Sequence, residues 1–154
     1  MSATLPILES IRARLLDKID RYAVELFPDD LANYHLKDED GAILIQYAGS
    51  KFALTDSTSL IQQQRDVYIS LTILSRSQHD DHGALEILDK VRLAIVGFRP
   101  TNCEACALES EQFEGEEAGV WMYQLMVKTE TWQVELVEPT DSHLFVQALY
   151  RRKP

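Results

Sequence analysis

The chain has 154 residues, 45% of them hydrophobic, and a formal net charge of −10 at pH 7. This length and composition predict one globular domain with a substantial core. The negative charge argues against sequence-independent binding to nucleic-acid phosphates, and no apolar run approaches the roughly 20 residues that span a bilayer. Two cysteines are too few for a disulfide framework and no secretory signal is visible, so we expect folding in a reducing cytoplasm.

The first predicted element is a helix over residues 6–27. Its apolar side chains recur every three or four residues, as on one face of a helix: Leu8, Ile11, Leu15, Ile19, Tyr22 and Leu26. Pro28 would end this helix. A turn at residues 38–41 then separates a weak strand over residues 32–37 from a stronger strand that contains Ile43 and Ile45.

A strand–helix–strand module follows in the middle of the chain. Residues 65–75 and 119–131 alternate apolar and polar side chains, which predicts two long strands. Residues 83–96 carry an apolar stripe that predicts an amphipathic helix, ended by Gly97 as a left-handed cap residue. We therefore expect an α+β fold, with an antiparallel sheet of four to five strands and two helices packed on one face. The opposite face of the sheet would be partly open or covered by a subunit.

The expected domain covers residues 1–138, and residues 139–154 form a C-terminal tail or arm. Two stretches within the domain lack clear periodicity. Residues 51–64 form a long connection, which is either a surface loop or a segment ordered by a neighbouring subunit. Residues 104–117 contain six glutamates and no lysine or arginine, and we interpret them as an acidic loop. Near the other end, residues 151–153 are all basic.

Candidate catalytic and metal-binding residues are few. Cys103 and Cys106 have CxxC spacing, but they follow the predicted helix, whereas redox-active pairs sit at a helix N-terminus. Glu104 between them would raise both thiol pKa values. His79 and His82 could complete a zinc site with the cysteines, but the intervening helix would separate the two pairs by about 20 Å. With no phosphate-binding or hydrolase motif in addition, we expect no enzymatic activity, no cofactor and no metal.

Five segments then carry a resemblance to a known family: residues 41–50, 64–71, 83–89, 97–100 and 113–123, with sequences such as GAILIQYAGS, QRDVYISL and FEGEEAGVWMY. Together they resemble the small tail proteins of Mu-like prophages, which are similar to phage tail terminators. The resemblance covers roughly residues 5–132 and rests on structural residues alone. It implies an α+β subunit of a six-fold ring that caps the tail tube, stops its polymerisation and helps to join tail to head.

The resemblance also implies partners and a location. The partners would be copies of the same chain, the tail tube protein, and head-completion or sheath proteins, with no specific nucleic-acid contact and no membrane. The protein would act in the cytoplasm of the bacterial host during assembly and remain in the virion tail.

We expect contacts between subunits to involve segments without core periodicity and charged segments. These candidates are Leu60, Ile61, Gln64, Glu114, Glu116, Glu117, Phe145, Arg151 and Arg152. The alternative is a stand-alone small-ligand-binding or regulatory α+β module without catalysis. A third interpretation is a redox or metal protein that uses Cys103 and Cys106.

Overall fold

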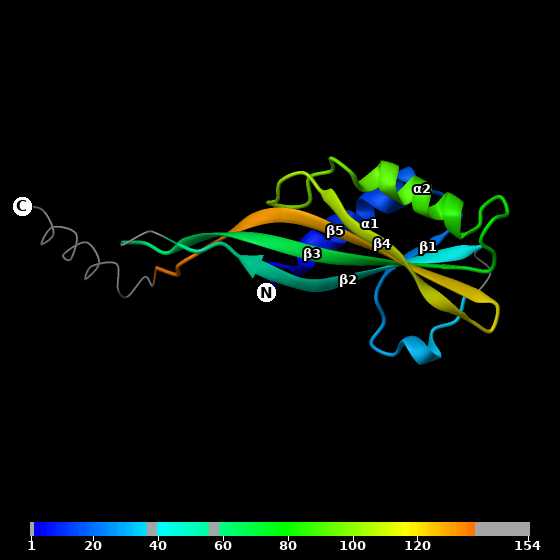
Figure 1. Cartoon of the computed structure of the whole chain (residues 1–154). Coiled ribbons are helices and arrows are strands. Elements are labelled where there is room, and N and C mark those ends of the chain that lie inside the picture. Colours follow the sequence, from blue (N-terminus) through cyan, green and yellow to red (C-terminus); the bar gives the residue numbers. More distant parts are fainter. Residues whose placement is uncertain (1, 37–39, 56–58, 138–154) are drawn as a thin grey trace, which may run out of the picture.

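The computed structural model describes residues 2–36, 40–55 and 59–137. Its elements in chain order are α1 (Leu5–Lys18), β1 (Ala23–Leu26), the 3-10 helix η1 (Leu31–Asn33), β2 (Gly41–Phe52), β3 (Gln62–Ser75), α2 (Ala84–Ile95), β4 (Ala107–Glu117) and β5 (Val120–Val134). The five strands form one sheet in the order β1-β2-β3-β5-β4, and both α-helices cover the same face (Figure 1). The predicted α+β class is therefore confirmed.

The core lies between the two helices and one face of the sheet. Paired residues on neighbouring strands point to the same face, so Ile45, Leu71 and Leu125, which are in register, together form part of this surface. All three are buried against the helices, together with Ile11 of α1 and Val91 of α2. The period-2 pattern of the strands and the 3.6-residue pattern of α2 both come from this single buried layer.

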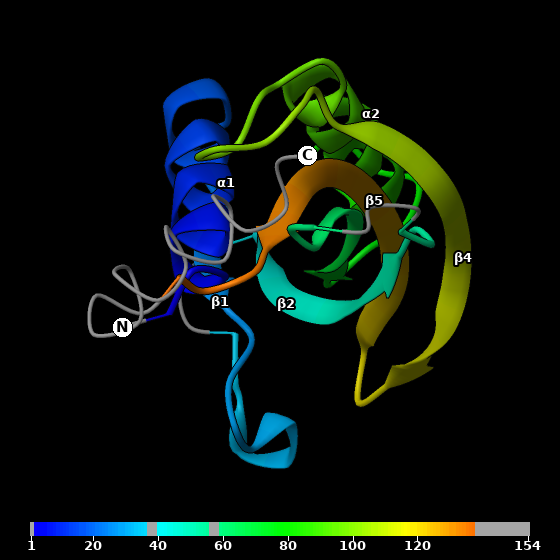
Figure 2. The same cartoon turned by 90° about the vertical axis from the view of Figure 1, so that its left-hand side faces the viewer.

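The opposite face of the sheet is covered at one end by the chain itself. The segment 27–36, which includes η1, packs on Ala42, Leu44 and Leu74 through a group of partly buried side chains: Phe27, Leu31, Tyr34 and Leu36. In both views this segment lies on the side of the sheet away from the helices (Figures 1 and 2). The expected partly open face is thus closed locally without a subunit.

The predicted helix over residues 6–27 is too long. α1 ends at Lys18, Ile19 is extended, and Arg21 has a positive φ of 81° that interrupts any helix. Residues 23–26 instead form β1, which pairs parallel to β2. Tyr22 and Leu26 are spaced as on a helix, but together with Val24 they also alternate as on a strand, and pairing with β2 decides between the two.

Three further boundaries differ from the sequence prediction. In residues 32–36 of the predicted weak strand, the structure has the end of η1 and irregular chain, while residues 37–39 lie outside the described part. The long connection is shorter than expected, because β2 extends to Phe52 and β3 begins at Gln62. The glutamate-rich stretch is mostly strand β4, joined to β5 by a tight turn in which Ala118 and Gly119 both have positive φ.

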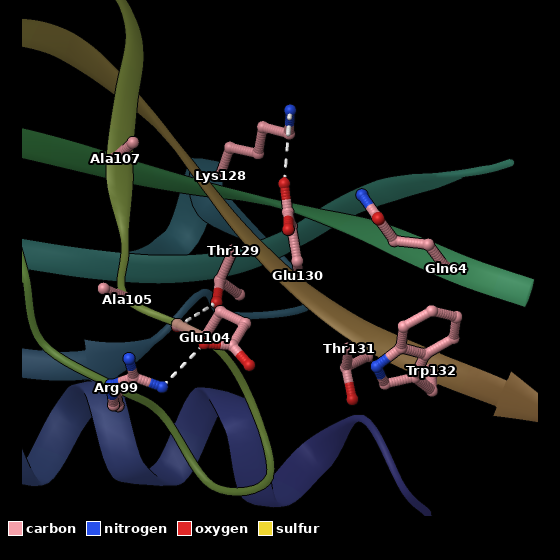
Figure 3. A pocket seen from close by; sticks show the side chains of 10 residues that line it. All are labelled: Gln64, Arg99, Glu104, Ala105, Ala107, Lys128, Thr129, Glu130, Thr131 and Trp132. Carbon is pink, nitrogen blue, oxygen red and sulfur yellow. Dashed lines mark hydrogen bonds and ion pairs between the residues drawn. The ribbon is translucent and has the colours of Figure 1, made fainter.

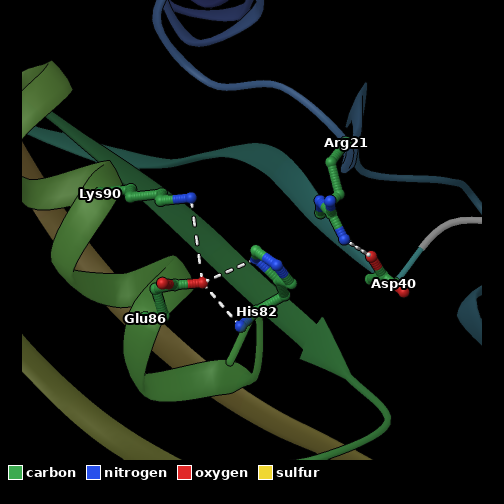
Figure 4. A network of polar contacts seen from close by, with 5 residues as sticks. All are labelled: Arg21, Asp40, His82, Glu86 and Lys90. Carbon is green, nitrogen blue, oxygen red and sulfur yellow. Dashed lines mark hydrogen bonds and ion pairs between the residues drawn. The ribbon is translucent and has the colours of Figure 1, made fainter. Parts of the chain in front are cut away.

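A polar network ties the start of α2 to the beginnings of β1 and β2 (Figure 4). The Glu86 carboxylate accepts a 2.6 Å bond from the His82 N–H and pairs with Lys90 at 3.9 Å. Partial burial alone would raise the pKa of Glu86, but the contacts with His82 and Lys90 outweigh it and lower that pKa. Lys90 also lies over the Tyr22 ring, next to the ion pair that Arg21 forms with Asp40.

Gly41 begins β2 where the sheet meets α2 without room for a side chain. A Cβ there would lie 2.6 Å from the Leu74 carbonyl oxygen and 2.8 Å from Ile87 Cδ1. We expect Gly41→Ala to lower the free energy of unfolding by about 1–3 kcal/mol, the usual cost of overpacking a core. Urea unfolding would measure it. The control is Ala48→Ser, at an exposed position of the same strand, which should change stability by less than about 0.5 kcal/mol.

Candidate protein-protein interface

The sheet extends beyond the helices as a three-stranded projection, which we call the arm (Figure 1). It consists of residues 51–54, 61–65 and 131–136, at the end of β2, the start of β3 and the end of β5. Register is maintained along it, since Phe52 pairs with Arg65 and Gln62 with Val134. Figure 2 looks along the strands from the arm and shows both helices on one side of it.

Large apolar side chains of the arm are exposed to solvent: Phe52, Leu54, Ile61, Trp132, Val134 and Leu136. Leu54 is 99% exposed and Trp132 is 57% exposed. A small sheet is stable in water when one apolar face is covered, and exposed apolar patches mark contact sites. The arm therefore has the chemistry of a surface that binds another protein.

The structure divides the predicted interface residues into two groups. Leu60 is partly buried and Ile61 is exposed at the tip of the arm, and Gln64 pairs with Trp132 across β3 and β5. Glu114, Glu116 and Glu117 are exposed on β4, near the other end of β5. Phe145, Arg151 and Arg152 lie outside the described residues.

β4 is an acidic edge strand. β5 pairs with one side of it, and no strand of the described residues pairs with the other. Glu111 is bound by Arg92 at 2.5 Å, whereas Glu114, Glu116 and Glu117 have no ion-pair partner within the described ranges. Two register shifts and a row of like charges both discourage strand addition at an edge. β4 therefore presents a charged surface and is a poor site for pairing with another strand.

A pocket of about 460 Å³ lies where β4 begins and β5 continues into the arm (Figure 3). Its lining includes an Arg99–Glu104 ion pair at 2.6 Å and a Lys128–Glu130 contact at 4.0 Å. Gln64 and Trp132 of the arm close its other end. Most of the lining residues are polar, and the charged ones already pair with one another. The pocket therefore presents no unpaired charge of these pairs to a ligand.

The two cysteines are poor nucleophiles. Burial raises the pKa of Cys106 to about 12, and burial also raises the pKa of Cys103 despite hydrogen bonds with Thr129 and Thr131. A reactive cysteine needs the opposite shift. Cys103 and Cys106 follow α2, whereas His79 and His82 precede it, as predicted. Within the described ranges no three His, Cys, Asp or Glu side chains are grouped as metal ligands.

The sequence prediction did not include Phe52, Leu54, Trp132 and Val134, which the structure shows as exposed apolar side chains of the arm. One signal was present: Phe52 and Leu54 are apolar residues at the start of a stretch without core periodicity. Trp132 and Val134 follow the strand pattern, so the sequence could not show that the helices end before them. None of the helices in the described part of the chain is long and apolar enough to cross a membrane.

Comparison with known proteins gives one family. The family model described as Gp37 protein matches residues 11–152. The chain belongs to the Gp37 protein family. This is a family of phage proteins, so the phage relationship inferred from the sequence is confirmed at that level. The match covers most of the predicted domain, residues 1–138, and most of the predicted tail, residues 139–154. No curated protein matches the sequence.

Proposed function

We propose that this Gp37-family protein is a phage tail assembly protein, a terminator-like ring subunit that caps the tail tube, stops its polymerisation and helps to join tail to head. It acts by binding and not by catalysis. It works in the cytoplasm of the bacterial host during assembly and stays in the virion tail. Membership in a phage family supports the phage setting, and the arm is the observation that carries the assembly role.

The arm suits head-to-tail association. A ring forms when each copy uses two different surfaces, one to bind and one to be bound, and the rotation between copies closes. An arm with exposed Phe52, Leu54 and Trp132 supplies apolar anchors that can lie on the body of the next copy or on the end of the tube. The proposed partners are copies of the chain, the tail tube protein, and head-completion or sheath proteins.

Charge supports the same role. The exposed glutamates of β4 and the net charge of −10 repel phosphate backbones, so DNA could pass through such a ring without adhering to it. We propose no specific nucleic-acid contact and no membrane contact. Glu114, Glu116 and Glu117, with Arg151 and Arg152, would select the correct neighbour, because charged rims favour specificity over affinity.

Deleting the gene from the phage or prophage tests the proposal. We expect electron micrographs to show tails longer than normal and heads without attached tails, and a plasmid copy of the gene should restore normal particles. Tails of normal length joined to heads in the deletion strain would refute the proposal.

The pocket of Figure 3 favours the second candidate, a small-ligand-binding or regulatory module. That function predicts a monomer whose melting temperature rises with ligand, in a strain whose tails stay normal when the gene is deleted. A screen of anionic and zwitterionic metabolites by thermal shift would reveal it.

A further inference from the structure

The Arg65 side chain has hydroxyl partners but no carboxylate partner within the described residues. Its Nε–H donates to Ser50 Oγ at 2.9 Å. Its Nη2 group donates to Thr4 Oγ1 at 2.9 Å and to Tyr47 OH at 3.2 Å. None of the ion pairs in the described ranges includes Arg65. Because hydroxyl oxygens accept hydrogen bonds without cancelling charge, Arg65 keeps its positive charge at a partly buried position.

These four residues, Thr4, Tyr47, Ser50 and Arg65, which we call the arginine cluster, contain more donors than acceptors. Each hydroxyl oxygen accepts from the guanidinium, so its own proton points elsewhere. Tyr47 and Ser50 share one of those protons at 2.6 Å. The Thr4 proton and the Nη1 group of Arg65 have no acceptor among the described residues. A carboxylate suits this set, because an ionised carboxylate only accepts hydrogen bonds.

The arginine cluster lies at the base of the arm, on the outer side of β2. β1 accompanies β2 only as far as Ile45, and within the described residues no strand pairs with β2 beyond that point on the same side. Phe52, the strand partner of Arg65, and Leu5, at the start of α1, are both about half exposed. An arginine beside exposed aromatic side chains has the composition of a binding hot spot, and Phe52 makes it continuous with the arm.

A surface of complementary charge lies on the opposite side of the molecule. Figure 2 shows α1 on one side and β4 on the other. On β4, Glu114 is exposed and has no ion-pair partner within the described ranges, and the neighbouring Phe113 is 53% exposed. Gln112 donates to one carboxylate oxygen of Glu114, which leaves the other for a partner. Glu116 instead serves the β4–β5 turn, because it accepts from the Gly119 N–H at 2.7 Å.

We propose that the arginine cluster of one copy binds Glu114 of a second copy. The two surfaces differ and lie on opposite sides of the chain, so the contact is head-to-tail. It rests on the ring subunit proposed above and identifies the two surfaces that join neighbours. Copies that each carry a net charge of −10 repel one another. An ion pair at one defined point opposes this repulsion and selects a single orientation.

Sedimentation velocity of the full chain, from micromolar to millimolar concentration, tests the proposal. We expect the unmodified chain to associate. Arg65→Glu or Glu114→Arg alone should weaken association at least about tenfold, because each places like charges opposite one another. A chain that carries both substitutions restores opposite charges and should regain most of the association.

Lys18→Glu is the matched control. It changes the net charge as Arg65→Glu does, but at the other end of α1, and should leave association unchanged. Circular dichroism melting would verify the fold of each variant. Glu114→Arg, at an exposed position of β4, keeps the test decisive if Arg65→Glu fails to fold.

Three results would overturn the proposal. A chain that stays monomeric at millimolar concentration has no such contact. A double variant that associates as weakly as the single ones would show that the two residues do not meet. Inorganic phosphate that raises the melting temperature of the unmodified chain but not of Arg65→Glu, without rescue by the double variant, would make the cluster a small-anion site. Rescue together with normal tails in the deletion strain would refute the tail function and retain this contact.

Discussion

Replacing Phe52 and Trp132 together with serine is expected to abolish tube capping while the fold is retained. Both side chains are about half exposed, so their removal should cost little stability. As anchors buried in an interface, each should contribute about 2 kcal/mol or more to binding. Their combined loss, about 4 kcal/mol, corresponds to roughly a thousandfold weaker association.

Co-sedimentation with tail tubes purified from a strain lacking the gene would measure this loss, and circular dichroism melting would verify the fold. Leu93→Ser is the matched control, because Leu93 is 82% exposed but lies on α2, away from the arm. Equal binding by the double variant and the unmodified chain would exclude the arm as the contact surface. Equal impairment of the control would show that exposed apolar residues in general, and not the arm, matter.

Stability is expected to fall steeply in alkali because of Cys106. Burial raises its pKa to about 12 in the folded chain, from an ordinary value of 9.0. Below pH 9 the Cys106 thiol is protonated in both the folded and the unfolded chain, so its full contribution to the free energy of unfolding is present. Between pH 9 and 12 only the unfolded chain releases the proton, so unfolding becomes easier by up to about 1.4 kcal/mol per pH unit. The total is about 4 kcal/mol.

Urea unfolding under reducing conditions, from about pH 8 to pH 11, would measure this slope. The raised pKa of Cys103 and of Tyr22 acts in the same direction, and the lowered pKa of Tyr47 acts in the opposite one. Cys106→Ala isolates the contribution of Cys106, because the variant keeps the other groups and should show a shallower slope. Identical slopes for the variant and the unmodified chain would show that the thiol titrates normally.

The candidate interface was predictable only in part. Ile61 and Gln64 were predicted because they lie in a stretch without core periodicity, and the structure places both on the arm. Glu114, Glu116 and Glu117 were predicted from their charge, in a segment interpreted as a loop that is strand β4. Trp132 could not be found, since an apolar residue in a strand has the same pattern whether a helix covers it or solvent does.

The sequence by itself determined the α+β class, the strands around Ile45, Leu71 and Leu125, and the helix α2. In each of these elements one face is buried, and burial imposes a period that can be counted along the chain. Tertiary structure alone decided three features: the strand at residues 23–26, the strand at residues 107–117, and the arm. Pairing with β2 holds the first strand and the hairpin with β5 holds the second, and neither strand buries one regular face. The arm depends on where the helices end. None of the three therefore leaves a period of its own in the sequence.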